Sequence, residues 1–96
     1  MVELIWSPRA INDLEEICRY IERDSEHYAR LLAQRVLALV EAIAQFPRAG
    51  RIVPEYRRED LRERIFQNYR IVYRIKPDAV EIVAIVHAAR LLPEID

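Results

Sequence analysis

The sequence predicts an α+β fold in two layers with the order β-αα-βββ: an N-terminal strand, a helical hairpin, and a small antiparallel sheet covered on one face by the helices. Residues 69–76 place Tyr or Ile at every odd position, which is typical of a half-buried strand. Residues 8–46 instead carry apolar side chains at helical spacing. With 96 residues, 52% of them hydrophobic, and one Gly, the chain has room for a single domain over residues 1–96 and no long linker.

The first strand and first helix meet at Ser7-Pro8. Val2, Leu4 and Trp6 alternate with polar or outward positions, which predicts a short strand with one apolar face. Ser is a good N-cap and Pro suits the first helical position, so a helix is expected from there to about residue 23. Its apolar stripe consists of Ala10, Leu14, Ile17 and Ile21.

A second helix is expected between a cap at Asp24 or Ser25 and the break at Pro47. The short connection makes the two helices antiparallel neighbours. Gly50, in the break that follows, is expected to have a positive φ. The predicted core stripe of this helix is Tyr28, Leu32, Val36, Leu39, Ile43 and Phe46.

The last third of the chain predicts a three-stranded meander. Residues 61–66 alternate with Arg62 and Arg64 on one side, and Gln67-Asn68 can turn into the strand at 69–76. Pro77-Asp78 is a turn dipeptide, so a two-residue hairpin should place Lys76 opposite Ala79. In that register residue numbers of partners sum to 155, which sets Arg74 opposite Glu81 and Tyr69, Ile71, Tyr73 and Ile75 opposite Val86, Ala84, Ile82 and Val80.

If the helices cover the face with Tyr69 and Tyr73, the other face is open. Its expected members are Arg70, Val72, Arg74, Val83, Ile85 and His87. An apolar strip flanked by Arg has the composition of a binding groove. In the alternative, the C-terminal tail Leu91 to Ile95 folds back and covers this strip.

The residue composition limits the ligands, metals and cofactors that the protein is expected to bind. The net charge is −1, but all fifteen basic residues except Lys76 are Arg, and Arg has a planar fork suited to phosphate or carboxylate. The lone Cys18 is expected as a small core-side residue, and His27 as a surface residue. No spacing typical of zinc ligands or of a phosphate-binding loop is present, so no metal or cofactor is expected. No apolar run reaches the roughly 18 residues of a membrane span, and a cytoplasmic location is expected.

An ordered set of short segments resembles the ParE branch of the RelE/ParE toxin superfamily over nearly the whole chain. That resemblance implies the β-αα-βββ toxin fold and a toxin of a type II toxin-antitoxin, or plasmid stabilisation, module. It also implies a cognate antitoxin whose disordered C-terminal segment folds onto the toxin. The segments are 5–10 (IWSPRA), 13–17 (DLEEI), Tyr20-Ile21, Phe46-Pro47, Gly50-Arg51, 53–55 (VPE), 61–63 (LRE), 68–73 (NYRIVY) and 87–90 (HAAR).

Two activities compete within such a superfamily: poisoning of DNA gyrase, and ribosome-dependent cleavage of mRNA. Cleavage by 2′-hydroxyl attack needs a general base, a general acid and a cation. Ala88 and Ala89 occupy the stretch where nuclease members usually carry a His or Tyr, and the Lys cluster of RelE itself is missing. The gyrase-directed reading, with no catalytic residue, is therefore preferred, and the nuclease alternative would use Arg70, His87 and Glu55.

The remaining option is a degenerate module component that binds its antitoxin without harming the cell. On either active reading, antitoxin or target is expected to bind the basic and apolar residues of the last third. These candidates are Arg62, Arg64, Arg70, Val72, Arg74, Val83, Ile85, His87 and Arg90.

Overall fold

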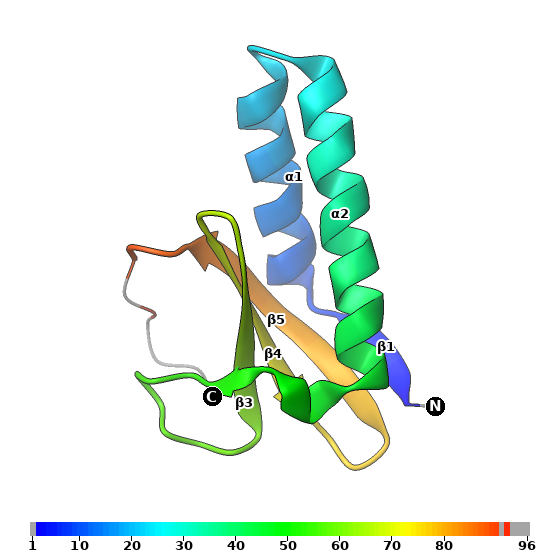
Figure 1. The fold of residues 1–96 in the computed structure, drawn as a ribbon, viewed down its shortest axis with the longest axis vertical. Helices are drawn as coiled ribbons and strands as arrows, with labels where there is room; N and C mark the ends of the chain where they lie inside the picture. Colours follow the sequence, from blue (N-terminus) through cyan, green and yellow to red (C-terminus); the bar gives the residue numbers. More distant parts are fainter. Residues whose placement is uncertain (1, 91, 93–96) are drawn as a thin grey trace.

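A computed structural model describes residues 2–90 and 92 and has two layers, a helical hairpin and a mixed sheet (Figure 1). The sheet order is β1-β5-β4-β3-β2, with β1 parallel to β5 and the other neighbours antiparallel. The predicted α+β class and element order are confirmed, with a short additional edge strand. The elements are β1 (Glu3–Trp6), α1 (Pro8–Glu22), α2 (Glu26–Gln45), the 3-10 turn η1 (Pro47–Ala49), β2 (Arg51–Ile52), β3 (Leu61–Phe66), β4 (Tyr69–Ile75) and β5 (Ala79–His87).

Both helices begin at serine caps. The Ser7 hydroxyl accepts a hydrogen bond from the Ala10 N–H at 3.0 Å, and the Ser25 hydroxyl accepts one from the Tyr28 N–H at 3.0 Å. Each cap satisfies one of the N–H groups that a helix N-terminus leaves without an intrahelical partner. Pro8 occupies the first turn of α1, as predicted.

The core between the layers differs in one respect from the predicted stripe of α2. Tyr28 and Phe46 are 42% and 68% exposed, although both were expected in the core. Tyr28 lies in the first turn of α2, where its hydroxyl donates to Gln67 Oε1 in the turn between β3 and β4 at 3.3 Å, outside the core. Phe46 is the C-cap of the helix and has non-helical dihedral angles, so its side chain leaves the buried stripe. Cys18 is partly buried against the core, as expected. The buried side of α2 consists of Ala29, Leu32, Val36, Val40 and Ile43.

The β4–β5 hairpin follows the predicted register only near its turn. Ile75, Arg74 and Tyr73 face Val80, Glu81 and Ile82 as expected. A bulge then places the extra residue Val83 in β5, so that Val72 pairs with Ala84, Ile71 with Ile85, and Tyr69 with His87. The predicted sum of 155 is therefore wrong beyond Tyr73, because one additional residue in β5 moves every later side chain to the opposite face.

The bulge is held by polar side chains from the start of α1. The Ser7 hydroxyl donates to the Val83 carbonyl at 2.9 Å, and the Ile85 N–H donates to Asp13 Oδ2 at 2.9 Å. Since β1 ends at Trp6, this stretch of β5 lies beyond the partner strand. The two side chains replace the backbone partners that the strand would have supplied.

The second face of the sheet is covered, which contradicts the expected open groove. Val72, predicted to line it, is fully buried. The loop between β2 and β3 contributes Val53, with Tyr56 packed against the cluster, and Leu92 covers it from the C-terminal side. The alternative in which the tail folds back is thus supported for Leu92, while residues 91 and 93–95 of that prediction lie outside the described part of the chain. The buried cluster comprises Val53, Leu61, Val72, Ala84, Val86 and Leu92.

Gly50 is required for space, and its predicted positive φ is wrong. Its φ is −74°, an ordinary value for any residue. The Tyr73 hydroxyl accepts a hydrogen bond from the Gly50 N–H at 3.1 Å and donates to the Pro47 carbonyl. A Cβ at Gly50 would collide with this hydroxyl and with the Glu63 carbonyl. The close approach fixes the chain between α2 and β2 to the centre of the sheet.

Candidate functional site

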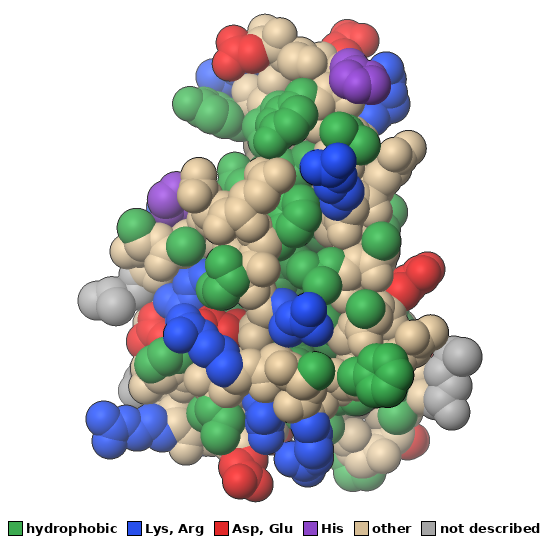
Figure 2. All heavy atoms as spheres, in the orientation of Figure 1, with side chains coloured by type: hydrophobic (Ala, Val, Ile, Leu, Met, Phe, Trp, Pro, Cys, Tyr) green, Lys and Arg blue, Asp and Glu red, His purple; other side chains and the backbone are tan. Residues whose placement is uncertain are grey.

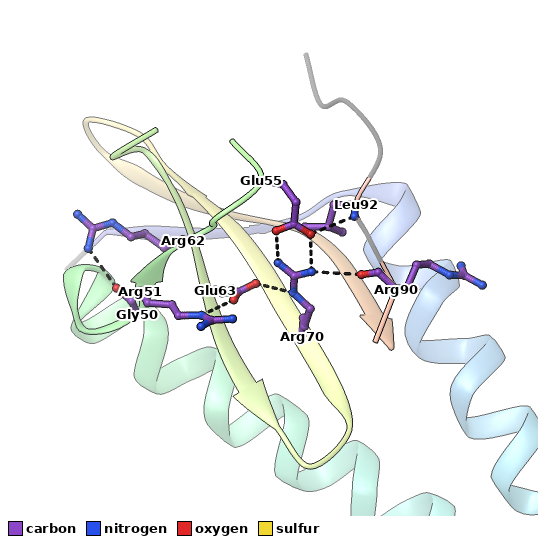
Figure 3. A network of polar contacts seen from close by, with 8 residues as sticks. All are labelled: Gly50, Arg51, Glu55, Arg62, Glu63, Arg70, Arg90 and Leu92. Atoms are coloured by element: carbon purple, nitrogen blue, oxygen red, sulfur yellow. Dashed lines mark hydrogen bonds and ion pairs between the residues drawn. The ribbon is translucent and has the colours of Figure 1, made fainter. Parts of the chain in front are cut away.

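Arg70, on β4, is the centre of a buried ion-pair network on the second face of the sheet (Figure 3). Only 5% of the residue is exposed. Its two terminal nitrogens donate to the Glu55 carboxylate at 2.6 and 2.7 Å, and its Nε donates to Glu63 Oε1 at 2.7 Å. The guanidinium fork is therefore occupied on both sides by carboxylates, which corrects the prediction of a solvent-facing cation.

Glu63, on β3, extends the network to the sheet edge. Its side chain is fully buried, and its Oε2 accepts a hydrogen bond from Arg51 Nε on β2. Burial of one carboxylate is tolerable because two arginines supply its hydrogen bonds. Charges alternate along the series Arg51, Glu63, Arg70 and Glu55, so the network is neutral as a unit.

The same network anchors the C-terminal segment. Glu55 Oε2 accepts a hydrogen bond from the Leu92 N–H at 3.2 Å, and Arg70 Nη1 donates to the Arg90 carbonyl at 3.2 Å. The Arg90 side chain itself is exposed and points away from Arg70 (Figure 3). The Glu55 carboxylate thus links its loop to the C-terminal segment, and the same two segments contribute Val53 and Leu92 to the buried cluster.

The pKa values of Glu55 and Arg70 lie far from neutral pH. Hydrogen bonding from Arg70, opposed by burial and aided by the Leu92 N–H, lowers the pKa of Glu55 to about 2. Hydrogen bonding to Glu55, again opposed by burial, raises the pKa of Arg70 above its already high ordinary value. Both groups stay ionised between pH 5 and 8. An acid or base that works near neutrality needs a pKa closer to the working pH than this pair provides.

A hollow of about 400 Å³ opens beside the network on the protein surface. Its polar lining comes from the ion-pair network, and its apolar lining comes from exposed side chains on the adjoining loops and on β3. The lining residues are Arg51, Pro54, Glu55, Ile65, Arg70 and Ala88.

His87 and Ile85 do not lie with Arg70, contrary to the prediction. The β5 bulge puts Ile85 into the core beneath the helices and pairs His87 with Tyr69, whose ring it meets edge-on at 6.1 Å between centroids. Tyr69 packs against the helix-side core. His87 is therefore on the opposite face of the sheet from the Arg70–Glu55 pair, and its Nδ1 accepts a hydrogen bond from the Ala89 N–H.

The remaining predicted basic residues are divided between the faces. Arg62 and Arg64 pair with Tyr73 and Ile71, which puts them on the helix side of the sheet. The Arg62 guanidinium has a structural role there, since it donates hydrogen bonds to the backbone carbonyls of Glu59, Arg48 and Gly50. Arg74 shares the Arg70 face and is partly exposed, while the Glu81 opposite it forms an ion pair with Lys76 at 3.5 Å.

Glu63 and Arg51 were not identified from the sequence as part of a site. Glu63 lies on the same side of β3 as Leu61 and Ile65. An acidic residue on the side of a strand that carries apolar residues is the signal that could have revealed it. Its partner could not be chosen, because neither Arg51 nor Arg70 is close to it in sequence. Among residues 2–90 and 92, no group of three or more His, Cys, Asp and Glu side chains is placed to hold a metal ion. Within the same residues, none of the helices combines the length and the hydrophobicity that a membrane span requires.

Residues 4–92 match the family described as the ParE toxin of the type II toxin-antitoxin system parDE. The chain is 36% identical over 92 residues to the protein named "Putative toxin Y4kP" of Sinorhizobium fredii, covering 94% of this chain and 92% of the relative. It is 34% identical over 91 residues to Toxin RelE2 of Caulobacter vibrioides, covering 95% and 100% of the two chains. A solved structure of the chromosomal ParDE system from P. aeruginosa has the same fold, with a TM-score of 0.75, 21% identity, and coverage of 91% and 96%.

The match to the family extends from β1 to Leu92, so it includes every residue of the ion-pair network. Two relatives above 30% identity are similar to the chain over more than nine-tenths of its length. The chain therefore belongs to the ParE toxin family of type II toxin-antitoxin systems, within the RelE/ParE superfamily, and a cognate antitoxin is its implied partner.

Proposed function

We propose that this toxin inhibits DNA gyrase by binding it, without an acid-base reaction of its own, and that its antitoxin blocks this inhibition. One observation carries the proposal: the three residues that a nuclease mechanism would need are not assembled. Arg70 and Glu55 are bound to each other, and His87 is on the other face of the sheet. Membership in the ParE family makes gyrase the preferred target.

The chemistry of RNA cleavage argues in the same direction. Attack by a 2′-hydroxyl requires a group that can take a proton near neutral pH and a cation that can reach the phosphate. Glu55 has a pKa of about 2, and its carboxylate occupies both terminal nitrogens of Arg70. A phosphate would have to displace that carboxylate before Arg70 could bind it.

The alternative function is ribosome-dependent cleavage of mRNA. It is retained because a relative with 34% identity carries the name RelE2, and because the hollow beside Arg70 and Glu55 is open to solvent. In this alternative the ribosome would have to rearrange the loop that carries Glu55, and His87 would have to act from outside the hollow.

Basic side chains remain the proposed contacts for a macromolecular target. On the face drawn in Figure 2, most Lys and Arg side chains lie over the half of the molecule that contains the strands, with hydrophobic side chains between them. Arg62, Arg64, Arg74 and Arg90 are the proposed basic members that keep partial or full exposure. Val72, Ile85 and Arg70 are buried, so we no longer propose them as residues that contact the target directly.

The two functions can be separated with purified protein. Supercoiled plasmid should be converted to cleaved or relaxed DNA by the toxin only when gyrase is present. His87→Ala should leave this effect and growth inhibition unchanged, because no proton transfer is asked of His87. In cells that express the toxin alone, a DNA-damage response without site-specific mRNA cleavage is expected. Cleavage of mRNA on translating ribosomes that disappears in His87→Ala would establish the nuclease alternative, since loss of a base or acid typically costs about 10²- to 10⁴-fold.

A further inference from the structure

The hollow beside the ion-pair network has an accessible cation. Arg51 uses its Nε for Glu63, and 60% of its side chain is exposed. Among the described residues, its two terminal nitrogens have no hydrogen-bond partner. These nitrogens form a planar donor fork at the rim, the geometry that binds a carboxylate with two parallel hydrogen bonds.

The charge that faces solvent at this place is positive. Glu63 is fully buried and Glu55 is 19% exposed, and both carboxylates are directed toward arginines inside the network. Arg51 therefore presents its charge outward, while its neutralising partner lies behind it. An incoming anion would meet Arg51 first.

The remaining walls are apolar and exposed. Ile65 is 49% exposed, and Pro54 and Ala88 are exposed as well. A volume of about 400 Å³ is within the roughly 300–1,000 Å³ of ligand sites and accommodates a few side chains. A ligand that fills it should combine one carboxylate with an aliphatic surface.

We propose that the hollow is a docking site for an acidic residue flanked by an aliphatic residue on a segment of the cognate antitoxin, with the carboxylate on Arg51 and the aliphatic side chain against Ile65. This inference rests on the antitoxin partner that the family implies and is independent of gyrase as the target. A polypeptide fits better than a nucleic acid, because one outward arginine beside apolar walls offers few phosphate contacts.

The test uses two adjacent alanines in the loop after β5. Ala88 lines the hollow and Ala89 does not, and both are exposed. Ala88→Glu and Ala89→Glu change the charge of the protein equally, but only the first adds a carboxylate where the ligand carboxylate would bind. Circular dichroism and urea midpoints equal to those of the unmodified protein establish that both variants fold.

Binding is measured by fluorescence anisotropy with synthetic peptides that tile the C-terminal half of the antitoxin encoded beside the toxin. We expect Ala88→Glu to weaken the best peptide by about tenfold or more, and Ala89→Glu by less than about twofold, because like charges placed together oppose binding. A peptide with its acidic residue changed to Lys should regain affinity for Ala88→Glu. In cells, the antitoxin should rescue growth poorly from Ala88→Glu and normally from Ala89→Glu.

Three results would overturn the inference. Affinities of both variants equal to that of the unmodified protein would mean that the hollow is empty in the complex. Equal weakening of both variants would indicate only a change in overall charge. Loss of binding to a labelled RNA oligonucleotide in Ala88→Glu, with peptide binding unchanged, would assign the hollow to nucleic acid. Inhibition of gyrase by each variant, measured without antitoxin, is a separate readout, so failure of the gyrase proposal is distinguishable from failure of this one.

Discussion

Replacing Arg70 by Ala tests whether the ion-pair network is structural. Seen only as part of a solvent-facing basic face, Arg70 would be expected to contribute little to stability, since surface substitutions usually change it by less than about 0.5 kcal/mol. In the structure its side chain is 6% exposed and contacts two carboxylates. Arg70→Ala leaves Glu63 with only Arg51, while Glu55 loses both of its hydrogen bonds from the guanidinium.

The expected loss is about 3–5 kcal/mol of unfolding free energy, because removal of one partner leaves a buried charge without full compensation. Most of this cost is assigned to Glu63, whose side chain is fully buried, since Glu55 is 19% exposed and can recover water. The C-terminal segment should also loosen, because the Arg90 carbonyl loses its donor.

Urea titration followed by circular dichroism measures the loss, with Arg35→Ala, an exposed position on α2, as the matched control. The control should stay within about 0.5 kcal/mol of the unmodified protein. The double variant Glu63→Ala, Arg70→Ala should lose less unfolding free energy than the sum of the losses in the two single variants, because Glu63→Ala removes the carboxylate that Arg70→Ala leaves without its partner. A loss below about 1 kcal/mol for Arg70→Ala, or simple additivity in the double variant, would refute a tightly coupled buried network.

Three further predictions concern the covered face and its anchors. Val72→Ala should cost about 2 kcal/mol in the isolated toxin, because the side chain is fully buried, and a urea titration showing less than about 0.5 kcal/mol would mean that the loop and Leu92 do not cover it in solution. Gly50→Ala should lower the thermal midpoint, since its Cβ would collide with the Tyr73 hydroxyl; recovery in the background of Tyr73→Phe would locate the clash, and an unchanged midpoint for Gly50→Ala would contradict it. The lowered pKa of Glu55 means that the unfolded state binds more protons than the folded state between about pH 4.5 and 2, so the stabilisation from ionised Glu55 is complete above this window and disappears as the pH falls through it. Urea midpoints of Glu55→Gln should therefore vary less with pH across the window than those of the unmodified protein. An identical pH dependence of the two proteins would be inconsistent with the ion pair.

The element order was accessible from sequence because local signals determine it. Ser7-Pro8, Ser25 and Pro47 begin or end helices through caps and through proline geometry, and each acts within a few residues. The alternation along β4 likewise identified which of its sides the helices cover. The register near the β4–β5 turn was predictable for the same reason, since a two-residue hairpin fixes only the pairs beside it.

The bulge at Val83 was not accessible from sequence, and it had the largest effect on the candidate site. Its stabilising partners are Ser7 and Asp13, 76 and 72 residues away in the chain from the residues they bond. A pattern with period two cannot reveal one inserted residue when the residues on both sides are apolar. The predicted groove therefore included Ile85 and His87, which the bulge turns toward the helices.

The layers, the helix ends and the toxin family could be inferred from the order of amino acids, because each depends on residues close together in the chain or on an ordered set of short segments. Which arginine can bind a partner depends instead on how the chain folds. Arg70 and Arg51 carry the same group, but the loop with Glu55 closes over Arg70 and leaves most of the Arg51 side chain exposed. Availability of a charge depends on what else is packed against it, and those neighbours come from separate strands and loops that only the folded chain brings together.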